Sequence, residues 1–299
     1  MFFSSAPELR DLEGWINSAP LTMKGLQGKV VLLDFWTYSC VNCLRTLPHL
    51  KRLHGTYAKH GLVLIGVHTP EFAFEREAGN VAAAVKRLGI PYPVALDSRN
   101  TTWKLYGNRY WPRQTLVDHR GRVAWEHTGE GGYEDLETWV QKLLRMAGVD
   151  VKEEASKEAW RSAFQDFDVT REIYAGSERN PGLGSSGVCG ADGVCRYLDQ
   201  AKQHERDVLY PSGEWVQRAE FLVATGKEAQ LALRYRAKEV NAVLNGPGMV
   251  DVRVDGKKRP PIKVDRPAMY TLATHKEAGE HEVVLHPQGK ISVYAFTFG

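Results

Sequence analysis

The chain has 299 residues, of which 43% are hydrophobic and 25% charged, a composition typical of globular proteins. Its length suits two domains rather than one. Its net charge of +3 is too small to indicate a nucleic-acid partner, and its longest apolar runs fall far short of the roughly 20 residues of a membrane-spanning helix.

The amino terminus, Met1 to Glu8, has no basic region and only a short apolar stretch, so it does not resemble a secretory signal peptide. If Met1 is the native start, we expect a cytoplasmic protein. If the sequence is a fragment of a secreted or membrane-anchored protein, we expect an extracytoplasmic one. The four cysteines do not decide this, because a catalytic cysteine pair works in either compartment.

The first half of the chain predicts strands that alternate with helices. Residues 1–28 are expected to form a lead-in, and a strand buried on both faces follows at 29–36, because this run is almost continuously apolar. The other expected elements are helix 43–60, strand 61–67, helix 73–88, strand 92–97, helix 101–106, a hairpin of strands 114–118 and 122–126, and helix 134–146. Their order predicts an α/β domain over residues 1–148.

The second half predicts strands alone. The charged stretch 149–175 is expected to be a linker, and the glycine-rich stretch 176–195 a mobile loop. Strands are expected at 214–222, 229–236, 249–254, 282–285 and 291–298, with a hairpin turn at 254–257. We therefore expect residues 176–299 to form an all-β, jelly-roll-like sandwich.

Cys40 and Cys43 follow the first buried strand, where a helix is expected to begin. Their spacing on one helical turn suits a disulfide, which needs Cα atoms about 5.5 Å apart. The free N–H groups and the positive dipole end of a helix favour a thiolate there. We therefore interpret the chain as a thiol–disulfide oxidoreductase, with Cys40 as the exposed nucleophile that forms a mixed disulfide and Cys43 as the residue that resolves it.

A zinc site is the alternative interpretation, with Cys189 and Cys195 completing a set of four cysteine ligands. The buried strand and the aromatic lead Trp36–Tyr38 argue against it, because zinc knuckles usually lie on hairpin turns. We therefore expect neither a metal nor a cofactor.

The string from Val31 to Arg45, VLLDFWTYSCVNCLR, resembles the thioredoxin superfamily and, within it, the TlpA-like redoxins. It is most similar to the carboxy-terminal region of DipZ-type proteins. The segments 67–72, 108–112 and 294–299 resemble the same group, so the resemblance spans nearly the whole chain. It implies a thioredoxin-like first domain, a carbohydrate-binding-module-like second domain and exchange with protein thiols in cell redox homeostasis.

The resemblance further implies that Pro112 is a cis-proline facing the dithiol, with the Trp111 backbone free to pair with a substrate strand. An ordinary trans-proline before the strand at Gln114 is the alternative, since only about 5–6% of X–Pro bonds are cis. Trp111 departs from the small or β-branched residues common before this proline in classical thioredoxins. We expect Trp36 and Tyr38 to pack around the dithiol, where Tyr38, like Trp111, would contact the substrate.

Asp34 is the one acid inside the first buried strand. A raised pKa would let it exchange protons with Cys43, whereas the other interpretation is a neutral or water-bonded acid without a kinetic role. The first is favoured, because a charge in an apolar strand is costly to keep. His68 and Glu71 either line the site or are solvated groups in a turn fixed by Pro70, and neither is assigned a catalytic role.

Val41 and Asn42 match neither the Gly-Pro of reducing thioredoxins nor the Pro-His of strong oxidants. The sequence therefore predicts the reaction, but not its direction in the cell.

Cys189 and Cys195 are expected to form a structural disulfide, worth roughly 2.4 kcal/mol in the loop-entropy model. A regulatory switch and a relay to Cys40 are the alternatives. The second domain would bind sugar if exposed aromatic rings stacked on it, and otherwise serves docking or spacing. The candidate rings, each in or beside a predicted strand, are Tyr210, Trp215, Tyr235, Tyr270 and Tyr294.

Two other function classes stay open. One is a peroxiredoxin-like peroxidase, since Thr37 and Cys40 give the formal Thr-x-x-Cys context, although the usual upstream proline is missing. The other is a non-catalytic binding protein. The expected partners are protein thiols or disulfides, an unidentified electron donor, and a carbohydrate or docking partner for the second domain, with no nucleic acid and no membrane span.

Overall fold

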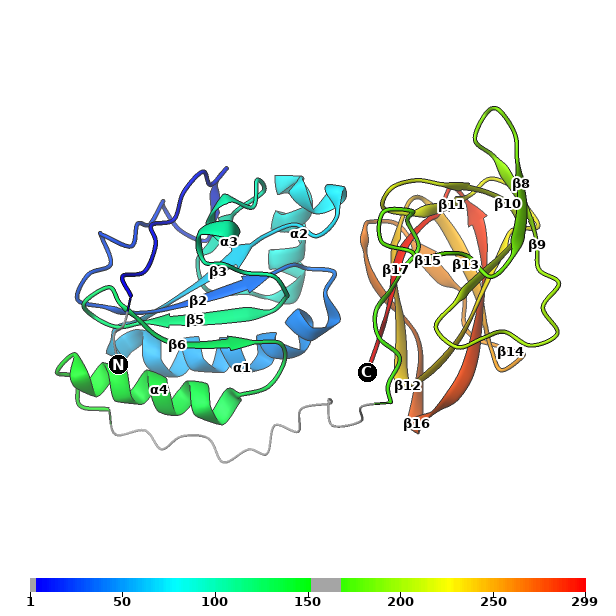
Figure 1. Ribbon diagram of the computed structural model, residues 1–299. Coiled ribbons are helices and arrows are strands. Elements are labelled where there is room, and N and C mark those ends of the chain that lie inside the picture. The colour runs from blue at the N-terminus through cyan, green and yellow to red at the C-terminus, as the bar shows by residue number, and fades with distance from the viewer. Residues whose placement is uncertain (1–3, 152–167) are drawn as a thin grey trace. The chain divides into compact units, whose positions relative to one another are not determined.

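The computed structural model describes residues 4–151 and 168–299, and each of these two ranges forms a compact unit (Figure 1). No helix in these ranges is long and apolar enough to cross a membrane. Most of the predicted linker 149–175 lies outside the described residues. At its end, Ile173–Tyr174 (β7) already pair with Ala295 and Phe296, so the second sheet begins before the predicted boundary at residue 176.

The first unit is built on a six-stranded mixed sheet with the order β1-β4-β3-β2-β5-β6. Strands β2, β3 and β4 are parallel, whereas β1, β5 and β6 each run antiparallel to their neighbour. All seven residues of the central strand β2 are buried, which confirms the strand expected there. The strands are β1 (Trp15–Ile16), β2 (Val30–Trp36), β3 (Leu62–His68), β4 (Val94–Leu96), β5 (Arg113–Val117) and β6 (Val123–Thr128).

The helices of this unit are α1 (Val41–Tyr57), α2 (Ala78–Leu88), α3 (Thr101–Leu105) and α4 (Tyr133–Met146), with 3-10 turns η1 (Ala58–His60) and η2 (Ala73–Arg76). Figure 1 shows α1 and α4 side by side. Buried Glu137 of α4 joins them, because it accepts hydrogen bonds from Arg52 at 2.5 Å and from the Tyr57 hydroxyl at 2.8 Å. The expected thioredoxin-like α/β fold is confirmed.

The second unit, in its described part, consists of eleven strands in one antiparallel sheet. Strand β12 pairs with β10 through its first half and with β17 through its second half, and β17 pairs with β11, which pairs with β10. The pairings of these four strands therefore form a closed circuit. The all-β expectation is confirmed, and the jelly-roll-like order stays a prediction. The remaining bounds are β8 (Ser186–Cys189), β9 (Cys195–Leu198), β10 (Leu209–Gln217), β11 (Leu222–Ala224), β12 (Gln230–Asn245), β13 (Gly248–Val254), β14 (Lys257–Lys258), β15 (Ile262–Val264), β16 (Ala268–Gly289) and β17 (Ser292–Phe298).

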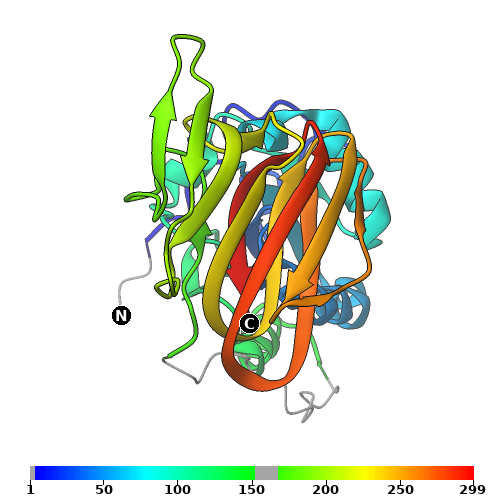
Figure 2. The same ribbon diagram turned by 90° about the vertical axis from the view of Figure 1, so that its right-hand side faces the viewer.

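Three sequence expectations for the second unit are wrong in detail. The predicted strand 214–222 is two strands, because the chain reverses between Gln217 and Leu222. The predicted loop 176–195 contains β8 and the start of β9, a hairpin that projects beyond the sheet in Figure 2. Strands β12 and β16 are far longer than predicted, because exposed charged residues interrupt their apolar pattern while cross-strand pairing continues.

Cys189 and Cys195 stand opposite each other in the β8–β9 hairpin and form a disulfide. Their sulfurs are bonded to each other, so the zinc site shared with Cys40 and Cys43 is contradicted. The candidate sugar-stacking rings Tyr210, Trp215, Tyr235 and Tyr294 are buried, and Tyr270 packs against the same core.

Gly66 offers a test of packing in the centre of the first sheet. A Cβ atom added there would lie 2.9 Å from Trp36 Nε1 and 3.3 Å from Tyr92, so Gly66→Ala should lower the free energy of unfolding by about 1–3 kcal/mol. Gly55→Ala is the matched control, because its new methyl meets nothing within 4 Å and removes a helix glycine. It should raise stability by about 0.5–1 kcal/mol. Equal effects of the two changes in urea unfolding would contradict this packing.

Candidate active site

The dithiol lies at the carboxyl edge of the sheet, where β2 ends and α1 begins. Cys40 is the N-cap residue of α1, and its sulfur accepts a hydrogen bond from the Cys43 backbone N–H at 3.3 Å. Cys40 is partly exposed and Cys43 is buried, and both are free thiols. The first turn of α1 contains no acidic residue, so no carboxylate there opposes the effect of the helix dipole on the Cys40 sulfur. Cys40, the expected nucleophile, is therefore accessible to solvent, whereas Cys43, the expected resolving residue, lies in the interior.

Asp34 lies beneath this edge in the middle of the sheet, opposite Gly66 on β3 and Gln114 on β5. Its carboxylate accepts one side-chain hydrogen bond, from Gln114 Nε2 at 3.1 Å. Burial raises the pKa of Asp34 to about 7, and the Gln114 bond offsets only part of this effect. Asp34 therefore changes protonation state near neutral pH, as its functional interpretation requires.

Cys43 responds to the same environment. Burial raises the pKa of its thiol well above the usual range, the neighbouring Cys40 raises it further, and the charge of Asp34 adds a smaller increase. A buried thiol of this kind stays protonated unless a nearby group accepts the proton.

Glu75 on η2 is a second buried carboxyl at the site, and the sequence analysis missed it. Its Oε1 accepts hydrogen bonds from Ser39 Oγ at 2.6 Å and from Ser39 N–H at 3.3 Å. Its Oε2 accepts the backbone N–H groups of Glu71 at 2.7 Å and Phe72 at 3.0 Å. Glu75 thus ties η2 to Ser39, the residue directly before Cys40.

Burial, followed by repulsion from Glu71, raises the pKa of Glu75 to about 7, although the hydrogen bonds from Ser39, Thr37 and Phe72 act in the opposite direction. One local signal could have indicated Glu75. It occupies the third position of a short helical turn, where a glutamate commonly accepts the N–H at the start of that turn.

His68, expected either to line the site or to be solvated in a turn, does neither fully. It is buried rather than solvated, its Nε2 lies 3.4 Å from Thr37 Oγ1, and its ring stacks on Tyr38. Burial lowers the pKa of His68 to about 3, so the ring is neutral at physiological pH. Tyr38 is itself buried, so its expected contact with the substrate is contradicted. Its ring instead supports the loop between β2 and α1, together with Trp36.

The Trp111–Pro112 peptide bond is cis. Arg113 pairs with Phe35, so Pro112 lies level with the end of β2, on the edge that carries the dithiol. The Trp111 side chain is held in place, since its Nε1 donates to the Thr69 carbonyl at 3.1 Å and its ring stacks on Trp103. Among the described residues, no hydrogen bond uses the Trp111 backbone.

The structure brings Cys40, Cys43, Asp34 and the Trp111–Pro112 bond to one edge of the first unit. Within residues 4–151 and 168–299, no group of three or more histidine, cysteine or acidic residues could hold a metal ion.

Comparisons with known proteins agree with this geometry. Residues 6–126 match the AhpC/TSA family, and residues 170–299 match the family described as "Thioredoxin like C-terminal domain". Protein DipZ of Mycobacterium bovis is 35% identical over 299 residues, which cover 99% of this chain and 43% of that protein. The chain thus spans less than half the length of this relative.

Two further matches cover the first half of the chain. Thiol-disulfide oxidoreductase ResA of Bacillus thuringiensis is 31% identical over 133 residues, which are 44% of this chain and 72% of that protein. The crystal structure of a thiol:disulfide interchange protein of the thioredoxin family from Chlorobium tepidum has a TM-score of 0.41 and 22% identity. That match covers 48% of this chain and 98% of the solved one.

Asp34 should make the stability of the first unit depend on pH. An unfolded aspartate ionises near pH 3.8, whereas folded Asp34 keeps its proton to about pH 7. Its contribution to stability is therefore fully present below pH 3.8 and is lost as the pH rises through 7, by at most about 4 kcal/mol at about 1.4 kcal/mol per pKa unit. Asp34→Asn should reduce this loss in urea unfolding between pH 4 and 8.

Asp11→Asn is the control for Asp34→Asn, because Asp11 is exposed and asparagine tolerates its positive φ of 53°. It should leave the pH profile unchanged. Both variants should still lose some stability as the pH rises, because the pKa of Glu75 is raised as well and this residue is unchanged in them. The assignment fails if Asp34→Asn and the wild type lose stability in parallel.

Glu75→Gln should destabilise the first unit by about 1–3 kcal/mol, because an amide NH₂ would face hydrogen-bond donors and leave them buried without an acceptor. The reduction potential of the Cys40–Cys43 pair should change as well, since Ser39 loses its anchor. Glu77→Gln is the matched control, because its side chain is exposed and forms no capping hydrogen bond at the start of α2. Urea unfolding measures the stability and redox titration measures the reduction potential. If Glu75→Gln matches the wild type in both, this role of Glu75 is refuted.

Proposed function

Since this chain belongs to the thioredoxin superfamily, in its TlpA-like branch, we propose that it exchanges electrons with protein substrates through the Cys40–Cys43 dithiol. The hydrogen bond from the Cys43 N–H to the sulfur of Cys40, at the start of α1, is the observation that carries this proposal. It stabilises negative charge on the more exposed sulfur of the pair.

Reduction of a substrate disulfide begins with attack by the Cys40 thiolate on one substrate sulfur. A mixed disulfide forms between Cys40 and the substrate, and the other substrate sulfur leaves as a thiolate that takes up a proton. The Cys43 thiolate then attacks the Cys40 sulfur, which releases the second substrate thiolate. The substrate gains two electrons, and the Cys40–Cys43 disulfide is the oxidised product. Oxidation of a substrate dithiol follows the same steps in reverse.

Asp34 supplies the proton transfer that the second attack needs. Cys43 holds its proton strongly because of burial, whereas the pKa of Asp34 is raised only to about 7, so its ionised carboxylate can accept that proton near neutral pH. In the reverse direction Asp34 returns the proton to Cys43. The Cys43 thiol and the Asp34 carboxyl interact electrostatically, so the protonation state of one changes the pKa of the other.

The backbone of Trp111 provides the contact for the substrate. An extended substrate segment can form strand-like hydrogen bonds with it, because that backbone is unused within the described residues and precedes the cis bond at Pro112. Specificity in this mode comes from side chains beside the substrate strand, among which the Trp111 ring is partly exposed. A separate electron donor or acceptor restores the starting state of the dithiol after each turnover.

The peroxidase alternative gains no support from the site. A peroxidatic cysteine acts first on peroxide, whereas here a buried second cysteine lies one helical turn away and donates its backbone N–H to the first sulfur.

An insulin-reduction assay with dithiothreitol tests this proposal. Cys40→Ser and Cys43→Ser should each abolish catalysis. Asp34→Asn should slow it about 100-fold near pH 7, at the lower end of typical general acid–base contributions. The double variant Cys189→Ser/Cys195→Ser is the control and should retain wild-type activity, because that disulfide lies in the other unit.

Three outcomes would reject it. Inactive wild-type protein would favour a binding protein, and peroxide consumption that needs only Cys40 would favour a peroxidase. Full activity of Cys43→Ser would exclude resolution by the second cysteine.

A further inference from the structure

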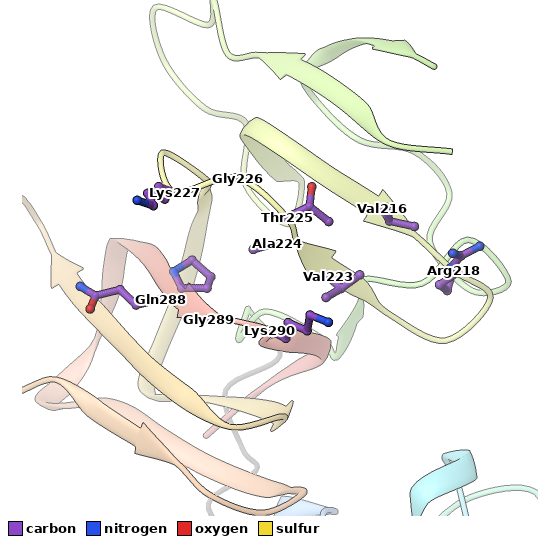
Figure 3. Close-up of a pocket in the computed structure, with 11 residues that line it drawn as sticks. Val216, Arg218, Val223, Ala224, Thr225, Gly226, Lys227, Gln288, Gly289 and Lys290 are labelled. Carbon is purple, nitrogen blue, oxygen red and sulfur yellow. The ribbon is translucent and has the colours of Figure 1, made fainter. Parts of the chain in front are cut away.

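The second unit contains a pocket of about 860 Å³, formed by the end of β10, by β11 and its following turn, and by the end of β16 (Figure 3). Ligand pockets in proteins commonly have volumes of about 300–1,000 Å³. None of the residues that line it belongs to the dithiol site, so the pocket is independent of the proposed function.

The floor of the pocket is apolar. Val216 and Ala224 are 6% and 4% exposed, Pro287 is buried, and Val223 is partly buried. No aromatic side chain lines the pocket, so it lacks the flat ring on which a neutral sugar would stack. The floor therefore suits an apolar body rather than a neutral saccharide.

The rim is positively charged. Arg218 and Lys227 lie at opposite ends of the pocket in Figure 3, with Lys290 between them, and all three are exposed. No acidic residue lines the pocket, and none of the three cations forms an ion pair within the described part of the chain. The neighbouring carboxylate of Glu214 is already paired with Arg196 at 2.6 Å.

Gly226 and Gly289 also line the pocket, and both pack closely against neighbouring parts of the chain. Gly289 has a φ of +97°, and a Cβ atom added there would lie 2.9 Å from the Pro247 carbonyl oxygen. A Cβ atom added at Gly226 would lie 3.1 Å from the Glu214 Cβ atom. The chain packs closely at both places, so a larger residue at either position would displace its neighbours.

We propose that this pocket binds an amphipathic organic anion. The apolar body of the ligand lies on the floor of Val216, Val223, Ala224 and Pro287. Its carboxylate, sulfonate or phosphate group lies at the rim formed by the three cations. Burial of the body provides the non-specific part of the affinity, and the uncompensated positive charge selects anions over neutral molecules of the same shape.

Two fluorescent probes with nearly the same aromatic body test the proposal on the full chain. 8-Anilinonaphthalene-1-sulfonate carries a negative charge, and N-phenyl-1-naphthylamine does not. The anion should bind more tightly at 50 mM salt, and 500 mM salt should weaken its binding more than that of the neutral probe, because salt screens exposed charges.

Substitutions assign the binding to this pocket. Lys227→Glu/Lys290→Glu should weaken binding of the anion about tenfold or more while changing that of the neutral probe little, since two exposed attractions become repulsions. Lys227→Arg/Lys290→Arg should retain binding. Lys257→Glu/Lys258→Glu is the matched control, because these exposed lysines lie on β14 and do not line the pocket.

Equal affinity for the two probes, or equal losses in the pocket variant and the β14 variant, would overturn the proposal. Insulin reduction is measured on the same samples. Preserved activity in the charge-reversed pocket variant shows an intact first unit, so a failure of the pocket and a failure of the dithiol mechanism are distinguishable.

Discussion

The burial of β2 on both faces is the constraint on which the first unit depends. A strand with all seven residues buried can lie only in the middle of a sheet covered on both sides, and β3 and β5 pair with it along its length. The chain leaves this strand at the carboxyl edge of the sheet, where α1 begins after the short loop 37–40. Cys40 becomes the N-cap of α1 as a consequence of this position, and the dithiol lies where the N–H groups of the helix point.

The same burial determines the acid–base properties of the site. Asp34 and Glu75 come from different elements, yet both lie in surroundings that raise their pKa to about 7. Their hydrogen bonds give them different roles. Asp34 has one amide partner and is linked to the titration of Cys43, so it is suited to proton transfer. Glu75 accepts hydrogen bonds from Ser39, Glu71 and Phe72, so it is suited to hold the loop before Cys40 in place.

The second unit is organised by the pairing of its strands and by the apolar core between them. The pairings of β10, β11, β17 and β12 form a closed circuit, and Trp215, Tyr235 and Phe296 belong to the apolar core of the unit. Rings used in this way are not available to stack on a sugar. The cationic pocket beside β11 is a polar feature of this unit that does not depend on exposed aromatic rings.

The sequence by itself determined the main helices and strands of the first unit, although not the two-residue strand β1, and it located the two cysteines and Asp34. Local periodicity and short spacings within one strand and one helix turn carry that information. The cis bond at Pro112 followed from the family resemblance rather than from any local pattern. Only the tertiary structure placed Glu75 against Ser39, buried Tyr38 under His68, extended β12 and β16, and brought three distant cations to one apolar floor. Each of these depends on contacts between segments far apart in the chain. Burial, which sets both pKa values and the availability of side chains, exists only once those segments have packed together.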